Sequence, residues 1–418
     1  MPNSSPDDDF TVLHRKFYFG WVVVAACTIT LGLTYGLMYS YSVFFKPLAD
    51  YFNWDRATVS LIYSASLIIR GAIAIGIGWL ADKYGAIKIS VFCGLMIGLG
   101  LILSGQVHNI WQFFLTYAVI EATGLSGAFG IGTAVVSRWF IKKRGLALGI
   151  VSTGSGLGTL LIVPGAERLV NAFGWSLSFV ICGAVAGVLM IGSAFFMRPA
   201  PKEASLKSKT GRATGSGPVS ASSPEGVTLR DALRSPKMLL LLGAFLLFFF
   251  CVQITMVHLV NFATDTGITP LVAATFISLI GAVSIAGRLT TGLGAERFGI
   301  NNSLILTRVF LAISFILLIF TRSTWMFYLF AVVFGFTYGG EVPQIPLFIG
   351  KFFGIGNMAT LVGLTIFIGN IGGAVGPWVA GEIFDTTHSY QWAFIAGAIA
   401  AVVSLWLAFI LKRQSSKE

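Results

Sequence analysis

The chain contains about twelve apolar stretches, each long enough, at about 20 residues, to cross a lipid bilayer as a helix. Hydrophobic residues make up 56% of its 418 residues, and charged residues only 11%. This composition predicts an all-α polytopic membrane protein with twelve transmembrane helices. We expect them at about residues 17–45, 57–80, 87–107, 111–139, 144–165, 175–197, 238–262, 270–294, 302–321, 324–350, 357–383 and 391–411.

The net charge of +11 is explained by membrane topology rather than by a nucleic-acid partner. If both termini are cytoplasmic, 22 of the 28 Lys and Arg residues fall on the inner side, Arg308 among them. Such a bias is the positive-inside rule with an even number of helices. We therefore predict a multi-pass protein of the plasma (inner) membrane with both termini in the cytoplasm. Arg70 and Arg288 are then the two basic residues left within the membrane.

The chain divides near its middle, where residues 198–237 are rich in Lys, Ser, Gly and Pro. Such a composition is typical of a flexible linker, predicted here on the cytoplasmic side. We expect a cytoplasmic tail at 1–16, a six-helix bundle at 17–197, a second at 238–411 and a tail at 412–418.

The two halves share a motif that recurs after 214 residues. Gly78-Trp-Leu-Ala-Asp82-Lys83-Tyr-Gly85 follows the second predicted helix, and Gly292-Leu-Gly-Ala-Glu296-Arg297-Phe-Gly299 follows the eighth. Arg138-Trp-Phe140 and Lys351-Phe-Phe353 repeat at nearly the same interval, 213 residues. Both repeats favour a duplicated six-helix unit in one orientation.

The motif Gly-x-Leu-x-Asp-Lys-x-Gly resembles the signature loop of the major facilitator superfamily, with a weaker second copy. This resemblance covers the whole chain. It implies two six-helix bundles around a central cavity that opens alternately to either side. It also implies that Asp82 and Lys83, with Glu296 and Arg297 in the second copy, brace helix ends at the inner face as gating structure.

Three further segments resemble the monocarboxylate transporters and the related oxalate/formate transporters. The resemblance implies a secondary transporter of a small monocarboxylate, such as L-lactate or pyruvate, that moves together with a proton. These segments are the beginning and end of helix 1 (Phe19–Val23 and Thr34–Lys46), the loop after helix 4 (Arg138–Gly149) and the end of helix 11 (Gly376–Asp385).

The chain departs from these families at three positions. Animal monocarboxylate transporters carry an Asp four residues before the Arg of helix 8 and a Lys in helix 1, where this chain has Ser284 and Tyr39. Oxalate/formate transporters tend to have a Lys in helix 11, where this chain has Gly369. The charged relay is therefore reduced to its Arg, and a two-cation clamp of the oxalate/formate kind is missing.

Arg288 lies within an otherwise uncharged run, residues 270–294. Arg keeps its proton, and a charge at the bilayer centre costs at least about 2.5 kcal/mol, so this side chain should face a partner or a polar cavity. A guanidinium binds carboxylates with two parallel hydrogen bonds. We therefore predict that Arg288 binds the substrate carboxylate.

Arg70 in helix 2 has two candidate partners, Glu121 in helix 4 and Glu341 in helix 10. A buried Arg70–Glu121 ion pair would make it structural and leave one cation for one carboxylate. A position facing the cavity would give Arg70 a role in binding or gating, because Arg70 and Arg288 together could then hold a dicarboxylate.

Glu121 and Glu341 are the two carboxylates predicted within the bilayer. They are the natural proton carriers, with His258 and Arg70 as further proton-coupling candidates; the alternative is that each acid is permanently paired or protonated. Some polar groups could hydrogen-bond the 2-hydroxy or 2-oxo function of a small acid, and we expect them at Tyr39, Tyr117, Tyr338 and Asn370. The alternative for the tyrosines is packing, which is the commoner role of aromatic residues in membrane spans.

Several function classes are disfavoured by the sequence. It shows no nucleophile–base set, metal-ligand spacing or phosphate loop, so we predict no enzyme activity, cofactor or metal. The Gly154-x-Gly-x-Gly158 pattern follows no strand and is interpreted as helix packing. Proton-coupled monocarboxylate symport by a monomer is the leading hypothesis, carboxylate exchange of the oxalate/formate type the alternative, and a non-transporting sensor the alternative from another class.

Overall fold

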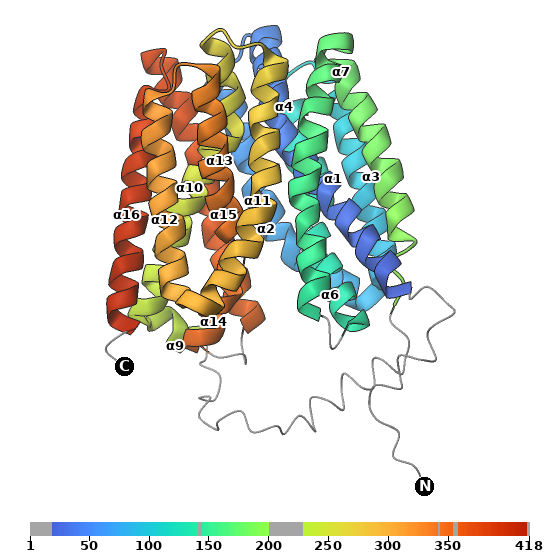
Figure 1. Ribbon diagram of the computed structural model, residues 1–418. Helices are drawn as coiled ribbons and strands as arrows, with labels where there is room; N and C mark the ends of the chain where they lie inside the picture. Colours follow the sequence, from blue (N-terminus) through green and yellow to red (C-terminus); the bar gives the residue numbers. More distant parts are fainter. Residues whose placement is uncertain (1–18, 141–143, 200–228, 342, 354–357, 416–418) are drawn as a thin grey trace.

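The computed structural model describes residues 19–140, 144–199, 229–341, 343–353 and 358–415. Within these ranges every regular element is a helix. The first residue of α1 (Phe19–Phe52) and the last of α16 (Gln391–Ser415) lie at the same end of the molecule (Figure 1). We call this the termini end and the opposite one the far end.

The N-terminal half forms six spans. Gly174 (φ 73°, ψ 170°) divides α7 into two helices, because 51 residues of continuous α-helix would measure about 77 Å, more than twice the bilayer core. The remaining elements are α2 (Arg56–Tyr84), α3 (Ala86–Ser104), a fourth span made of α4 (Ile110–Phe113), the π-helical η2 (Phe114–Glu121), α5 (Ala122–Leu125) and α6 (Ala128–Trp139), and α7 (Arg144–Ala194).

The C-terminal half forms six more spans, so the prediction of an all-α protein with twelve transmembrane helices is confirmed. Among the described residues, ten helical segments are long and apolar enough to span a membrane, the composite fourth span included; α7 counts as two, and α13 is the twelfth, followed by α14. The elements are α9 (Leu229–Arg234), α10 (Pro236–Asp265), α11 (Pro270–Phe298), α12 (Ile300–Phe320), α13 (Thr324–Glu341), α14 (Gln344–Phe353), α15 (Met358–Thr387) and α16.

The repeated motif forms the same turn in both halves. Gly85 joins α2 to α3 with φ 96° and ψ 145°, and Gly299 joins α11 to α12 with φ 83° and ψ 147°. These values lie in a region that favours glycine, since other residues would be strained there. The sequence repeat therefore corresponds to a repeat of chain geometry.

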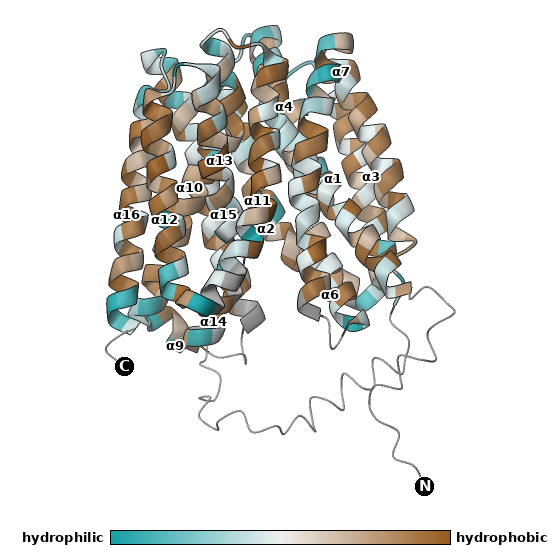
Figure 2. Ribbon diagram, in the orientation of Figure 1, coloured by the Kyte–Doolittle hydropathy of each residue, from teal (hydrophilic) through white to brown (hydrophobic). Residues whose placement is uncertain are grey.

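Each half forms a bundle, and the bundles meet through α2 against α15, α7 against α11 and α1 against α10. Figure 2 shows apolar residues over the middle of the molecule and hydrophilic residues towards both ends. Among the described residues, the polar contacts between bundles lie from the middle towards the far end, except that of Arg288 with Ser152, which lies on the termini side of the middle. The ribbons diverge towards the termini end (Figure 1). The bundles are thus joined at the far end.

Candidate functional site

Arg288 lies on α11 where the two bundles meet. Its side chain is half-buried, and Nη1 donates a hydrogen bond to the main-chain oxygen of Ser152 on α7, at 2.8 Å. Its Nε is buried and has no hydrogen-bond partner. The ion pairs among the described residues do not include Arg288. This guanidinium therefore keeps hydrogen-bond donors for a ligand.

Close packing of α7 on α11 places Arg288 beside that carbonyl. A Cβ atom on Gly156 of α7 would lie only 2.6 Å from the carbonyl oxygen of Gly281 on α11. Such an approach requires glycine. It also brings together Ser152, one turn from Gly156 on α7, and Arg288, two turns from Gly281 on α11. The adjacent Gly154 and Gly158 pack against α1, so the interpretation of this glycine pattern as helix packing is confirmed.

Arg70 does not pair with Glu121. The side chain is half-buried on α2, and its Nη1 donates to the thioether sulfur of Met38, at 2.9 Å. A thioether is a weak acceptor and carries no charge. The predicted alternative of a structural Arg70–Glu121 ion pair is therefore wrong for this state, since neither carboxylate oxygen of Glu121 has a hydrogen-bond partner.

Glu121 is the last residue of η2, and its side chain is 1% exposed. A Cβ on Gly100 of α3 would lie 2.6 Å from the Glu121 main-chain nitrogen, so α3 packs directly on this backbone. The Arg70 charge interacts electrostatically with the carboxyl group. Short π-helical segments occur frequently at functional sites. Glu121 is thus an enclosed acid close to a cation that it does not touch.

The hydroxyl groups of Tyr39 on α1 and Tyr338 on α13 lie 2.8 Å apart and join the two bundles. The Tyr338 hydroxyl interacts electrostatically with both Arg288 and Arg70. Asn370 of α15 lies next to α2 beside Gly71, since a Cβ there would be 3.2 Å from its Nδ2. Three of the predicted substrate-binding residues therefore lie where the bundles meet, Tyr39 and Tyr338 between α1 and α13 and Asn370 between α15 and α2.

Tyr117, also predicted to bind substrate, lies elsewhere. Its ring is buried and packs against Tyr41, Phe113 and Phe179, all in the N-terminal bundle. Its binding role stays a prediction.

Glu341 forms a buried ion pair with Arg308 of α12, with two hydrogen bonds of 2.5 Å. The expectation that Arg308 lies on the inner side is wrong, because its side chain is 0% exposed and its guanidinium faces the rings of Phe245 and Phe248. Arg308 lies well inside the predicted span 302–321, and this position could have indicated that it is buried in the membrane rather than on the inner side. Glu167 on α7 is a further buried acid, with Asn171 as its donor.

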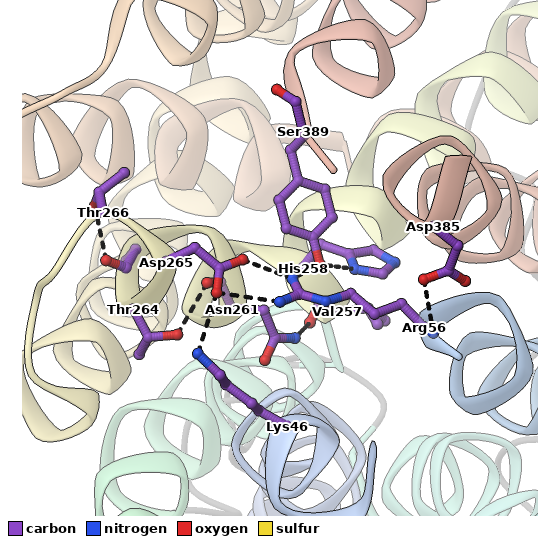
Figure 3. A network of polar contacts seen from close by, with 12 residues as sticks. Lys46, Arg56, Val257, His258, Asn261, Thr264, Asp265, Thr266, Asp385 and Ser389 are labelled. Atoms are coloured by element: carbon purple, nitrogen blue, oxygen red, sulfur yellow. Dashed lines mark hydrogen bonds and ion pairs between the residues drawn. The ribbon is translucent and has the colours of Figure 1, made fainter. Parts of the chain in front are cut away.

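A second polar cluster joins the bundles at the far end, and we call it the far-end network. Asp265 at the end of α10 accepts hydrogen bonds from Lys46 of α1, at 3.1 Å, and from Arg56 of α2, at 2.7 Å (Figure 3). Asp385 of α15 accepts from the main-chain nitrogens of Arg56, at 3.0 Å, and Ala57, at 2.6 Å. The sequence analysis did not identify this shared acid.

His258 is fully buried next to the far-end network. Its Nε2 lies 2.9 Å from the main-chain oxygen of Pro377, which can only accept, so Nε2 carries the hydrogen. The Nδ1 atom then accepts from the Tyr390 hydroxyl, at 3.0 Å, which itself accepts from Arg56, at 2.6 Å. Burial raises the pKa of Tyr390, so this hydroxyl keeps its proton. The arrangement holds a neutral imidazole, and the proton-coupling role of His258 stays a prediction.

The predicted gating loops lie at the termini end. Lys83 and Arg297 are exposed there, with Lys83 near the ring of Trp79 and Arg297 near that of Phe298. The side chains of Asp82 and Glu296 lie outside the described residues. The bracing role of all four residues stays a prediction.

Replacement of Asp265 by Asn should weaken far-end closure. The variant loses two partly exposed ion pairs, together worth about 1–2 kcal/mol, which corresponds to about a 5- to 30-fold shift towards far-end opening. Labelling of a cysteine at Ser60, which is buried on α2 below the network, by a membrane-impermeant maleimide would report this opening in a background without the four native cysteines. Asp50→Asn, exposed at the end of α1, is the matched control. Equal labelling of both variants would contradict a gating role.

Comparison with known proteins gives the family. The sequence profile of the Major Facilitator Superfamily matches residues 27–377. This chain belongs to the Major Facilitator Superfamily. Its members are transporters rather than enzymes, so the chain is a multi-pass membrane protein of a transporter family with a small-molecule substrate.

The similarity to monocarboxylate transporters within the Major Facilitator Superfamily is confirmed. Monocarboxylate transporter 12 of Xenopus laevis is 25% identical over 413 residues, covering 94% of this chain and 90% of that protein. Human monocarboxylate transporter 2 is 27% identical over 416 residues, covering 93% and 84%.

Two solved structures of the Major Facilitator Superfamily share the fold. One is a bacterial homologue of the human lysosomal transporter Spinster, inward-facing and unoccupied, with a TM-score of 0.73, 17% identity, and coverage of 95% of this chain and 98% of that one. The other is the nucleoside transporter NupG, with a TM-score of 0.72, 16% identity, and coverage of 93% and 98%.

Proposed function

We propose that this protein transports a small monocarboxylate, such as L-lactate or pyruvate, together with a proton by alternating access. The observation that carries the proposal is Arg288, a half-buried guanidinium between the bundles with donors to spare and no carboxylate partner among the described residues. A carboxylate would satisfy these donors in a bidentate pair. Tyr39, Tyr338 and Asn370, which also lie where the bundles meet, are the groups that suit a hydroxyl or oxo function on the acid.

Coupling of anion transport to a proton has a physical reason. Moving a lone anion against a negative interior costs about 2.3 kcal/mol for each 100 mV, and a co-transported proton cancels this cost. Glu121 is the carrier that we favour, because its carboxyl group is enclosed and unpaired, whereas Glu341 is held by Arg308. We place the termini end in the cytoplasm, so this state faces inward with the far-end network closed. One copy holds the whole site, which suits a monomer.

Uptake of labelled L-lactate into proteoliposomes tests the proposal. With an acidic exterior, lactate should accumulate above its equilibrium level, and a protonophore should release it. A potassium diffusion potential should have little effect, because the pair of lactate and proton carries no net charge. Accumulation that requires no proton gradient would contradict symport. If none of a panel of small labelled acids is transported, the sensor hypothesis would replace it.

Carboxylate exchange of the oxalate/formate type is the second candidate, and one observation favours it. Arg70 lacks a carboxylate partner among the described residues, and the next residue, Gly71, packs on Asn370 of the other bundle, so a second cation lies near the bundle interface. Rapid lactate-independent exchange of labelled oxalate in vesicles preloaded with a diacid, without net lactate uptake, would support this function instead.

A further inference from the structure

The start of α2 and the end of α15, which belong to different bundles, meet within the far-end network. α2 begins at Arg56, and the main-chain nitrogens of Arg56 and Ala57 each donate to one oxygen of Asp385 on α15, at 3.0 and 2.6 Å (Figure 3). The first N–H groups of a helix have no partner within that helix, so they need an acceptor from outside. The last turn of α15 therefore supplies a cap for α2.

The place of Asp385 in its own helix is electrostatically unfavourable. α15 ends at Thr387, so this carboxylate lies in the last turn, next to the negative end of the helix dipole. The start of α2 presents the positive end of a second dipole, and hydrogen bonds from main-chain N–H groups to a carboxylate are stronger than those between neutral groups. Contact with the other bundle thus compensates a charge that α15 alone would leave unfavourable.

Gly381, one turn before Asp385, allows this close approach. A Cβ atom on Gly381 would lie 2.8 Å from the main-chain nitrogen of Ala57 and 2.8 Å from the main-chain oxygen of Arg56, so a larger residue would push α2 away. The segment Gly376–Asp385, one of the three that resemble the monocarboxylate transporters, therefore combines the glycine that lets α2 approach with the acid that caps it.

α2 also has an acid of its own at the position where a cap is expected. Asp55 is the N-cap residue, with the extended backbone (φ −63°, ψ 152°) typical of that position, and Asp is among the residues preferred there. Its side chain is exposed and makes no capping hydrogen bond. An N-cap side chain accepts from the second or third N–H of the helix, and the second, that of Ala57, is bonded to Asp385 in this state. The two acids therefore compete for one donor.

We propose that two acids cap the start of α2 in turn, Asp385 while the far end is closed and Asp55 when it opens. Opening of the far end must separate α2 from α15, because these helices join the two bundles there. Asp385 then leaves both N–H groups, and Asp55 reaches that of Ala57 by rotation of its side chain. The helix end stays capped in both states, so opening costs less free energy than the loss of a cap would. The exchange does not depend on which small molecule the protein transports.

Distances between spin labels at the far end test the proposal. Asp50→Cys on α1 and Thr324→Cys on α13, both at exposed positions, carry the labels in a background without the four native cysteines, and double electron–electron resonance in lipid nanodiscs separates closed from open molecules. Asp385→Asn, which loses the charge and one acceptor oxygen, should raise the ratio of open to closed molecules about 5- to 30-fold. Adding Asp55→Ala should lower this raised ratio about 5-fold, because the open state then loses its cap. Glu382→Gln, exposed on α15, is the matched control and should leave the ratio unchanged.

The opposite signs of the two changes distinguish an exchange of caps from general destabilisation. An unchanged ratio in Asp385→Asn would overturn the proposal, and so would a double variant whose ratio equals or exceeds that of Asp385→Asn. If Asp385→Asn does not fold, Asp55→Ala in an Asp265→Asn background decides, because the same decrease of about 5-fold is expected there. The spin-label distances are measured without substrate, so a failure to transport lactate would overturn the proposed function and leave the exchange of caps standing.

Discussion

Replacement of Arg288 by Gln should abolish transport at substrate levels that saturate the wild type. The glutamine keeps much of the side-chain length but loses the charge and the planar fork that pairs with a carboxylate. Removing one partner of a desolvated charge pair costs about 2–5 kcal/mol, so apparent affinity should fall roughly 30- to 5,000-fold. Uptake of labelled L-lactate into proteoliposomes measures this effect.

Two companion variants separate charge from geometry. Arg288→Lys keeps a point charge but cannot make two parallel hydrogen bonds, so it should retain a small fraction of uptake. Arg322→Gln is the matched control, because Arg322 is exposed beyond α12 and donates to the main-chain oxygens of Ile319 and Thr321. Full uptake by Arg288→Gln would place the substrate carboxylate elsewhere.

Replacement of Arg308 by Met should destabilise the fold. The change leaves the Glu341 carboxylate buried without its cation, and breaking a buried pair from one side costs about 3–5 kcal/mol. The variant should therefore lose its monodisperse form at a markedly lower temperature than the wild type when heated in detergent. Size-exclusion chromatography after a temperature series measures this loss.

The double variant Arg308→Met/Glu341→Leu distinguishes a pairing effect from a packing effect. Removing both charges also removes the desolvation cost, and such replacements are often neutral or stabilising. We expect the double variant to be much more stable than Arg308→Met. Arg322→Met, at an exposed position, serves as the control. A double variant as unstable as the single one would show that Arg308 acts through its volume and not its charge.

The membrane-spanning segments and the repeat were predicted well because their signals are local. Hydropathy is a property of about 20 consecutive residues, and it identified the two spans of α7 on either side of the turn at Gly174. The echo around Gly85 and Gly299 was visible because one positive-φ turn requires glycine at both places. Arg288 was selected as a candidate for a similar reason, since a charge within an apolar run stands out by itself; its binding role stays a prediction.

The pairings of the charged residues were predicted poorly. Glu121 and Glu341 were the two candidate partners of Arg70, but Arg70 donates to Met38, and Glu341 pairs with Arg308, 33 residues away. Asp265 received no role, yet it holds Lys46 and Arg56 across the interface.

The sequence by itself determined that this chain is a helical membrane protein made of two related halves with an isolated cation between them. The tertiary structure alone decided which polar groups meet, such as the hydroxyls of Tyr39 and Tyr338, 299 residues apart. The physical reason is that burial in a membrane depends on the composition of one segment. Pairing depends on how each helix is rotated and where it crosses its neighbours, which is set by contacts such as Gly156 against Gly281.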